Sequence, residues 1–122
     1  MPIKTILVVD DSPTERYFLT DLLRKNGFEV VAAETGEDGV AKAKQEKPDL
    51  ILMDVVMPGL NGFQATRMLA RDPATKAIPV IMCTTKNQET DRVWGLRQGA
   101  IDYLVKPIAA AELLAKIQSL GQ

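Results

Sequence analysis

The segment Leu50-Ile51-Leu52-Met53-Asp54-Val55-Val56-Met57-Pro58-Gly59 contains an apolar run, then an acid, and then a Pro-Gly pair that interrupts regular secondary structure. A continuous apolar run of this length is typical of a strand buried on both faces, as in a parallel sheet covered by helices. Pro58-Gly59 then takes the chain out of the sheet. Asp54 is therefore expected at the carboxyl end of a central strand, where open α/β sheets bind their ligands.

Four further strands and five helices are predicted around this segment. The other apolar or β-branched runs are residues 6–9, 28–33, 80–83 and 101–105. Capping residues, stop signals and apolar spacing predict helices from Pro13 to about Asn26, over 37–47, from Asn61-Gly62 to about Arg71, over 88–98 and over 110–120. The run 28–33 is the least apolar and is expected at a sheet edge. Strict alternation predicts an α/β fold, a doubly wound parallel sheet of order 2-1-3-4-5 (flavodoxin-like), forming a single domain over 1–122.

Composition excludes several classes of function. The chain has 122 residues, a net charge of -1 and no histidine. The near-neutral charge gives no reason to expect a nucleic-acid or membrane partner, and the lack of histidine excludes Ser-His-Asp catalysis and the usual His-based zinc sites. Cys83 is the single cysteine and lies in an apolar run, which predicts a small core residue and a reducing compartment. Without a signal peptide or a long apolar run, the chain is expected to be cytoplasmic.

Polar residues follow four of the five predicted strands directly. They are Asp10-Asp11, Asp54, Thr84 and Lys106. Because the carboxyl ends of parallel strands meet at one edge of a sheet, these side chains are expected to converge. Neighbouring carboxylates repel one another unless a cation is present, and an oxygen-only ligand set suits Mg²⁺. Lysine and threonine suit a phosphoryl group, so the pattern predicts phosphoryl transfer to Asp54 as a carboxylate nucleophile.

The same residues, taken with Met57-Pro58-Gly59 and Lys106-Pro107, resemble the receiver domain of two-component response regulators. The resemblance extends over the whole chain. It implies that Asp54 is the phosphoacceptor, that the donor is a phosphohistidine on a histidine kinase, and that the cofactor is Mg²⁺.

The resemblance also implies a role for each residue of the site. Asp11, Asp54 and the backbone carbonyl of Val56 would hold the metal directly, and Asp10 would act through water. Lys106 would be the lysine of the site, joined to Pro107 by a cis peptide bond. Thr84 and Tyr103 would form the switch, with Tyr103 rotating inward on phosphorylation.

A stand-alone regulator without an output domain is the function that the resemblance implies. Such a protein would be a monomer that signals to a downstream protein through the face formed by its fourth helix (88–98), Tyr103 and its last helix (110–120). It would be an acceptor and a binding switch, not a turnover enzyme. The stretches 58–67 and 91–100 look most like regulators of type IV pilus chemosensory systems, the PilH type, which control twitching motility. A regulator of flagellar chemotaxis and a phosphate sink are the alternatives.

Two other classes share parts of this pattern. A haloacid-dehalogenase-like phosphatase needs an acid two residues after its nucleophile, where this chain has Val56. A flavodoxin-like cofactor binder needs a phosphate-binding loop after the first strand, where Asp10-Asp11 would repel phosphate. Neither Val56 nor Lys86 can orient a hydrolytic water, which predicts slow self-dephosphorylation. Trp94 is expected to pack in the core, with a partly exposed position on a partner surface as the alternative.

Overall fold

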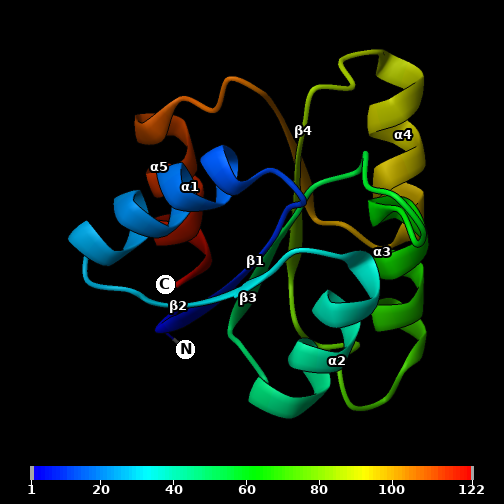
Figure 1. Cartoon of the computed structure of the whole chain (residues 1–122), viewed down its shortest axis with the longest axis horizontal. Helices are drawn as coiled ribbons and strands as arrows, with labels where there is room; N and C mark the ends of the chain where they lie inside the picture. The colour runs from blue at the N-terminus through cyan, green and yellow to red at the C-terminus, as the bar shows by residue number, and fades with distance from the viewer. Residues whose placement is uncertain (1, 122) are drawn as a thin grey trace.

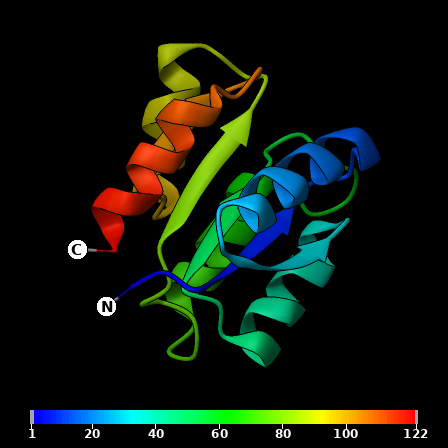
Figure 2. The same ribbon diagram turned by 90° about the vertical axis from the view of Figure 1, so that its left-hand side faces the viewer.

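A five-stranded parallel sheet forms the centre of the protein. The computed structural model describes residues 2–121. The strand order is β2-β1-β3-β4-β5, as predicted. The strands are β1 (Thr5–Val9), β2 (Glu29–Ala33), β3 (Leu50–Met53), β4 (Val80–Thr84) and β5 (Asp102–Val105). The helices are α1 (Pro13–Lys25), α2 (Gly36–Glu46), α3 (Gly62–Arg71), α4 (Glu89–Gln98) and α5 (Ala110–Leu120). Helices α1 and α5 cover one face of the sheet, and α2, α3 and α4 cover the other (Figures 1 and 2).

Alternate residues of the central strands face opposite layers of helices, because side chains alternate along a strand. In β3, Leu50 and Leu52 pack in the core beneath α1 and α5. Ile51 and Met53 pack in the core beneath α2 and α3. All four are fully buried, which explains why β3 reads as an unbroken apolar run.

Local sequence signals place the helix ends within about one residue of the predictions. Ser12 caps α1 by accepting a hydrogen bond from the backbone of Glu15 at 3.3 Å. Asn61 and Gln64 form a reciprocal capping box at the start of α3. Helix α2 ends at Glu46 because Lys47 adopts a left-handed backbone with φ 47°. The predicted cis peptide between Lys106 and Pro107 is confirmed.

Helix α4 differs from the expectation for its large side chains. The prediction that Trp94 packs in the core is wrong, because 48% of its surface is exposed. The inner side of α4 is formed instead by Gly95 and Gln98. The ring of Tyr103 lies under Gly95, so that a Cβ atom at Gly95 would be 3.2 Å from it. An aromatic ring from β5 therefore fills the space that an inward tryptophan would need. Among residues 2–121, no helix is long and apolar enough to span a membrane.

Candidate functional site

Three carboxylates meet at the carboxyl ends of β1 and β3. Oxygen atoms of Asp10, Asp11 and Asp54 all lie within 4.8 Å of one another. Their proximity follows from the strand register, because Val9 pairs with Met53 and the next residues leave the sheet side by side. Asp10 and Asp54 are buried, whereas Asp11 is exposed. The predicted convergence of these acids is confirmed, and one of them faces solvent where an ion or a ligand would arrive.

Lys106 is the positive charge of this site. Its Nζ donates a hydrogen bond to Asp10 Oδ2 at 2.7 Å and lies 3.6 Å from Asp54 Oδ1. The end of β5 places it there, since the Lys106 backbone N–H donates to the Thr84 carbonyl at 2.8 Å. One ammonium faces three carboxylates, so the cluster carries an excess of negative charge when all the acids are ionised.

The surroundings disfavour the ionised form of Asp54. Burial, and then the neighbouring Asp10, raise the pKa of Asp54 to about 6, although Lys106 pulls it in the opposite direction. Burial alone would lower the pKa of Lys106, but its hydrogen bond to Asp10 and the nearby Asp54 raise it. A divalent cation would relieve the repulsion among the acids, and the donor set consists of oxygen atoms, which Mg²⁺ prefers. These residues therefore fit the predicted metal.

The acids are held in place by backbone contacts that no local sequence pattern predicts. Asp10 Oδ1 accepts a hydrogen bond from Ser12 N at 2.9 Å, and Asp54 Oδ1 accepts one from Val55 N at 2.9 Å. Arg16 donates to the carbonyl of Asp10 at 2.6 Å. Its guanidinium also lies 3.6 Å from Glu34. The sequence shows that Arg16 is a basic residue in the first turns of α1, but it does not show that Arg16 contacts Asp10.

Thr84 lies at the same edge of the sheet but turns toward the next loop. Its side chain is fully buried, and Oγ1 accepts a hydrogen bond from Lys86 N at 3.2 Å. Within residues 2–121 the structure records no hydrogen bond between Thr84 and Asp54. Thr84 is therefore hydrogen-bonded to the β4–α4 loop, whereas Lys106 is hydrogen-bonded to the acid cluster.

Tyr103 is connected to the same loop from the other side. Its hydroxyl donates to the backbone carbonyl of Lys86 at 2.8 Å, and 4% of its surface is exposed. Burial raises the pKa of Tyr103 to about 12. Gly95 of α4 leaves room for the ring between the sheet and the helix. The side chain thus already lies inward in this structure, and Gly95, a glycine within a helical pattern, was the sequence signal for its position.

Val56 offers a backbone oxygen near the acids. Val56 follows Asp54 by two positions and is 55% exposed. No backbone hydrogen bond to its carbonyl is recorded in the described range, so that oxygen is available as a ligand.

Cys83 is buried as expected, and burial raises the pKa of its thiol to about 12. The thiol is therefore un-ionised at neutral pH and is not a nucleophile of this site.

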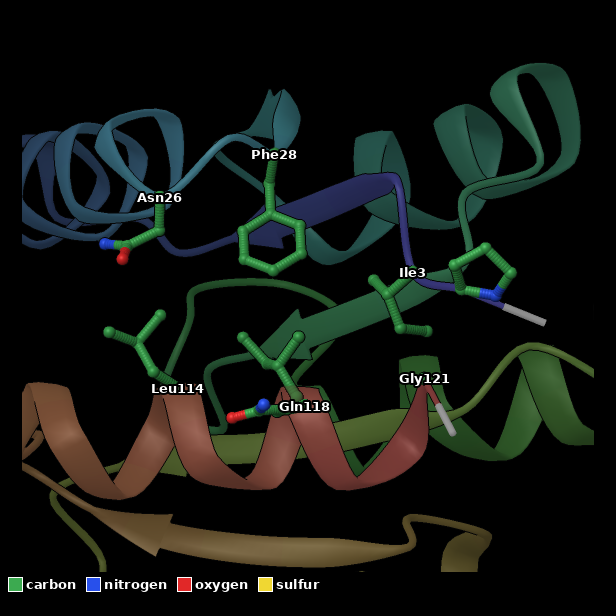
Figure 3. Close-up of a pocket in the computed structure, with 8 residues that line it drawn as sticks. Ile3, Asn26, Phe28, Leu114, Gln118 and Gly121 are labelled. Atoms are coloured by element: carbon green, nitrogen blue, oxygen red, sulfur yellow. The ribbon is translucent and has the colours of Figure 1, made fainter.

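An apolar pocket lies at the opposite end of the sheet from the acids. It has a volume of about 310 Å³ and is bordered by the start of β1, the start of β2 and the last turns of α5. Figure 3 shows Phe28 and Leu114 pointing into it from opposite walls. Of residues 2–121, no charged side chain lines it. Among the described residues the pocket therefore offers neither an acid nor a base, whereas the cluster of Asp10, Asp11 and Asp54 offers three acids.

Comparison with known proteins agrees with the fold. The family model for the response regulator receiver domain matches residues 6–118. The chain therefore belongs to the response regulator receiver family. It is 64% identical to protein PilH of Pseudomonas aeruginosa PAO1 over 115 residues, which covers 94% of this chain and 95% of that protein. The predicted likeness to the PilH type is thereby confirmed.

Other relatives share the domain in different contexts. The phosphate regulon regulatory protein PhoB of Escherichia coli is 41% identical over 96% of this chain, which spans about half, 51%, of PhoB. The chemotaxis protein CheY4 of Vibrio cholerae has a TM-score of 0.90 at 32% identity, covering 97% of this chain and 98% of that one. The receiver domain of the sensor histidine kinase PA1611 of P. aeruginosa PAO1, solved with a magnesium ion in its active-site cleft, has a TM-score of 0.90 at 33% identity and covers 98% of each chain.

Proposed function

We propose that this protein is a two-component response regulator that accepts a phosphoryl group on Asp54 from a histidine kinase. The observation that carries the proposal is the convergence of Asp54 with Asp10, Asp11 and Lys106 at one edge of the sheet. The membership of the chain in the receiver family supports the kinase as donor. In this proposal, residues 1–122 form a single receiver domain.

In the proposed reaction, a carboxylate oxygen of Asp54 attacks the phosphorus atom of a phosphohistidine. A P–O bond to Asp54 forms as the P–N bond to histidine breaks, and the histidine nitrogen keeps the electron pair and takes up a proton. The product is an acyl phosphate. Lys106 lies 3.6 Å from Asp54 and can turn its ammonium from Asp10 to the incoming phosphoryl oxygens. Such a transfer depends on positioning and charge neutralisation.

Asp11, Asp54 and the carbonyl of Val56 would hold Mg²⁺, with Asp10 acting through water. When bound, the ion would neutralise charge on the acids and on the phosphoryl oxygens. Asp10 is 1% exposed and is already bonded to Lys106, which suits an indirect role. Asp11 is exposed and suits direct coordination.

The proposed output is a change on the face formed by α4, β5 and α5. Thr84 and Tyr103 both bond to Lys86, so a pull on the Thr84 hydroxyl by a phosphoryl oxygen would move the loop that also anchors Tyr103. Large apolar side chains on or beside α4 and β5 are exposed, as a protein-binding surface requires: Val93, Trp94, Leu96, Ile101 and Val105. Because the Tyr103 side chain already lies inward, phosphorylation would stabilise this inward position and would not need to create it.

The likeness to PilH supports a role in type IV pilus chemosensing and twitching motility. We propose a cytoplasmic monomer that binds a downstream protein and functions as an acceptor and switch, without turnover of a substrate. A regulator of flagellar chemotaxis remains the second candidate, supported by the likeness to CheY4. Binding assays of the phosphorylated protein with pilus components and with flagellar components separate these candidates.

Removal of divalent cations is expected to stop phosphorylation. With a small acyl phosphate as donor, the protein should incorporate a phosphoryl group when Mg²⁺ is present and lose about a hundredfold in rate when EDTA replaces it, because the acids then repel the donor. Intact-protein mass spectrometry measures the incorporation. Restoring Mg²⁺ should restore the rate, and incorporation that is equally fast in EDTA would contradict the metal assignment.

Replacing Val56 with asparagine is expected to shorten the lifetime of the phosphorylated protein. The Val56 side chain is exposed beside Asp54 and cannot bond to water, whereas a carboxamide there can orient a water molecule toward phosphorus. We expect dephosphorylation to accelerate about tenfold, measured as loss of label after removal of the donor. Val56→Leu serves as the apolar control. A wild-type label that disappears within seconds would refute the predicted slow self-dephosphorylation.

A further inference from the structure

A second pocket, which is polar, lies between the carboxyl-terminal ends of α3 and α4. Its volume is about 360 Å³, and half of its lining residues are arginines; the lining consists of Arg67, Ala70, Arg71, Arg97, Gln98 and Gly99. Helices in this fold run antiparallel to the strands they connect, so their carboxyl-terminal ends lie at the opposite edge of the sheet from Asp54 (Figure 1). The pocket is therefore separate from the acid cluster.

Small residues bring the two helices close together at the pocket. Gly99 has φ +119°, and a Cβ atom there would lie 2.8 Å from the Cβ of Ala70. Arg67 and Arg71 are one turn apart on α3, and residues at that spacing share a helix face. Arg97 is in the last turn of α4. Arginines from two helices thus line one hollow, with Ala70 and Gly99 as its small members.

The charge of these arginines is not balanced by neighbouring acids. All three are exposed, and none forms an ion pair within the described part of the chain. Asp72 directly follows Arg71 but pairs with Lys44 at 3.1 Å. Asp91 of α4 pairs with Lys86 at 3.7 Å. Since the whole chain has a net charge of -1, this is a local excess of positive charge.

Helix dipoles explain the arginines only in part. A cation in the last turn of a helix gains about 0.3–1 kcal/mol from the dipole, which accounts for Arg71 and Arg97 individually. Arg67 lies a turn further from the end of α3 and receives less of this benefit. The dipole also gives no reason for three arginines, which carry like charges, to line the same pocket.

We propose that this pocket binds a phosphate-bearing small molecule. Guanidinium groups present paired donors that match phosphate oxygens, and such charge-assisted hydrogen bonds are among the strongest in proteins. The volume falls at the lower end of the range for small-molecule sites. Gln98, which is 9% exposed, adds a carboxamide to the same lining. The bound ligand joins α3 to α4 two residues from Gly95, the position against which Tyr103 packs.

The test is a titration of the ¹⁵N-labelled protein with inorganic pyrophosphate in EDTA, followed by amide chemical shifts. We expect saturable shifts in residues 67–72 and 97–99. Arg97→Gln and Arg67→Gln should each weaken binding about tenfold or more, which corresponds to the loss of one charge-assisted contact. Arg24→Gln is the matched control, because Arg24 is also an exposed arginine in the last turn of a helix. It should bind as the wild type does.

Three outcomes of the pyrophosphate titration would overturn the proposal. They are the absence of saturable shifts, an equal loss in Arg24→Gln and Arg97→Gln, and shifts confined to the acid cluster and Lys106. Succinate at matched ionic strength provides a carboxylate comparison. Binding of succinate as tight as that of pyrophosphate would contradict the assignment to phosphate-bearing ligands. Unchanged thermal unfolding of each variant shows that lost binding is not lost folding.

Discussion

Replacing Asp54 with asparagine is expected to reduce phosphoryl incorporation from a small acyl phosphate by at least about a hundredfold, because a carboxamide oxygen is a very poor nucleophile. The substitution keeps the shape of the side chain and leaves an oxygen to accept the hydrogen bond from Val55 N. It also removes a negative charge that burial and Asp10 disfavour. The variant should therefore fold at least as stably as the wild type, so that lost labelling reports on chemistry alone.

Asp21→Asn is the matched control for this experiment. Asp21 lies on α1, is partly exposed and pairs with Lys25 at 3.1 Å, away from the acid cluster. The control makes the same chemical change and should be labelled at the wild-type rate. Labelling of Asp54→Asn at a rate near that of Asp21→Asn would mean that another group accepts the phosphoryl group.

Replacing Gly62 with alanine is expected to give the largest loss of stability among the single changes considered. A Cβ atom at Gly62 would collide with the backbone carbonyl oxygen of Asp54 and would lie 2.8 Å from the Cα of Val55. Both partners are backbone atoms just after β3, so neither can move aside as a side chain would. We expect a loss of about 3 kcal/mol or more in the free energy of unfolding, measured by denaturant titration.

Gly121→Ala is the control for Gly62→Ala. A Cβ atom at Gly121 has its nearest neighbours at 3.5 Å and beyond, which is ordinary van der Waals contact. This variant should change the free energy of unfolding by less than about 0.5 kcal/mol. A Gly62→Ala variant as stable as Gly121→Ala would contradict the close packing of α3 behind the phosphoacceptor.

The fold and the acid cluster could be predicted because both depend on short-range patterns. Apolar runs such as Leu50–Met53 mark buried strands, and the alternation with helices determines the topology. The residues after β1 and β3 then had to meet, because the carboxyl ends of parallel strands lie at one edge. Asp54 and Asp10 could therefore be placed together although 44 positions separate them in the sequence.

The position of Trp94 could not be predicted because it depends on what lies beneath α4. Helical spacing assigns an apolar side chain to the core only when the space below is open, and here Tyr103 of β5 fills that space. The contact of Arg16 with the Asp10 carbonyl depends likewise on how α1 lies over β1. The arginine pocket brings together Arg67 and Arg97 from different helices, which no local pattern indicates.

The most direct test of the central claim is to identify the labelled residue in the wild-type protein. After incubation with Mg²⁺ and a small acyl phosphate, hydroxylamine converts an aspartyl phosphate to a hydroxamate, which peptide mass spectrometry locates. We predict a hydroxamate on Asp54, formed only when both the donor and Mg²⁺ were present. A hydroxamate on Asp10 or Asp11, or a phosphoryl label that resists hydroxylamine, would contradict the assignment of Asp54 as the phosphoacceptor.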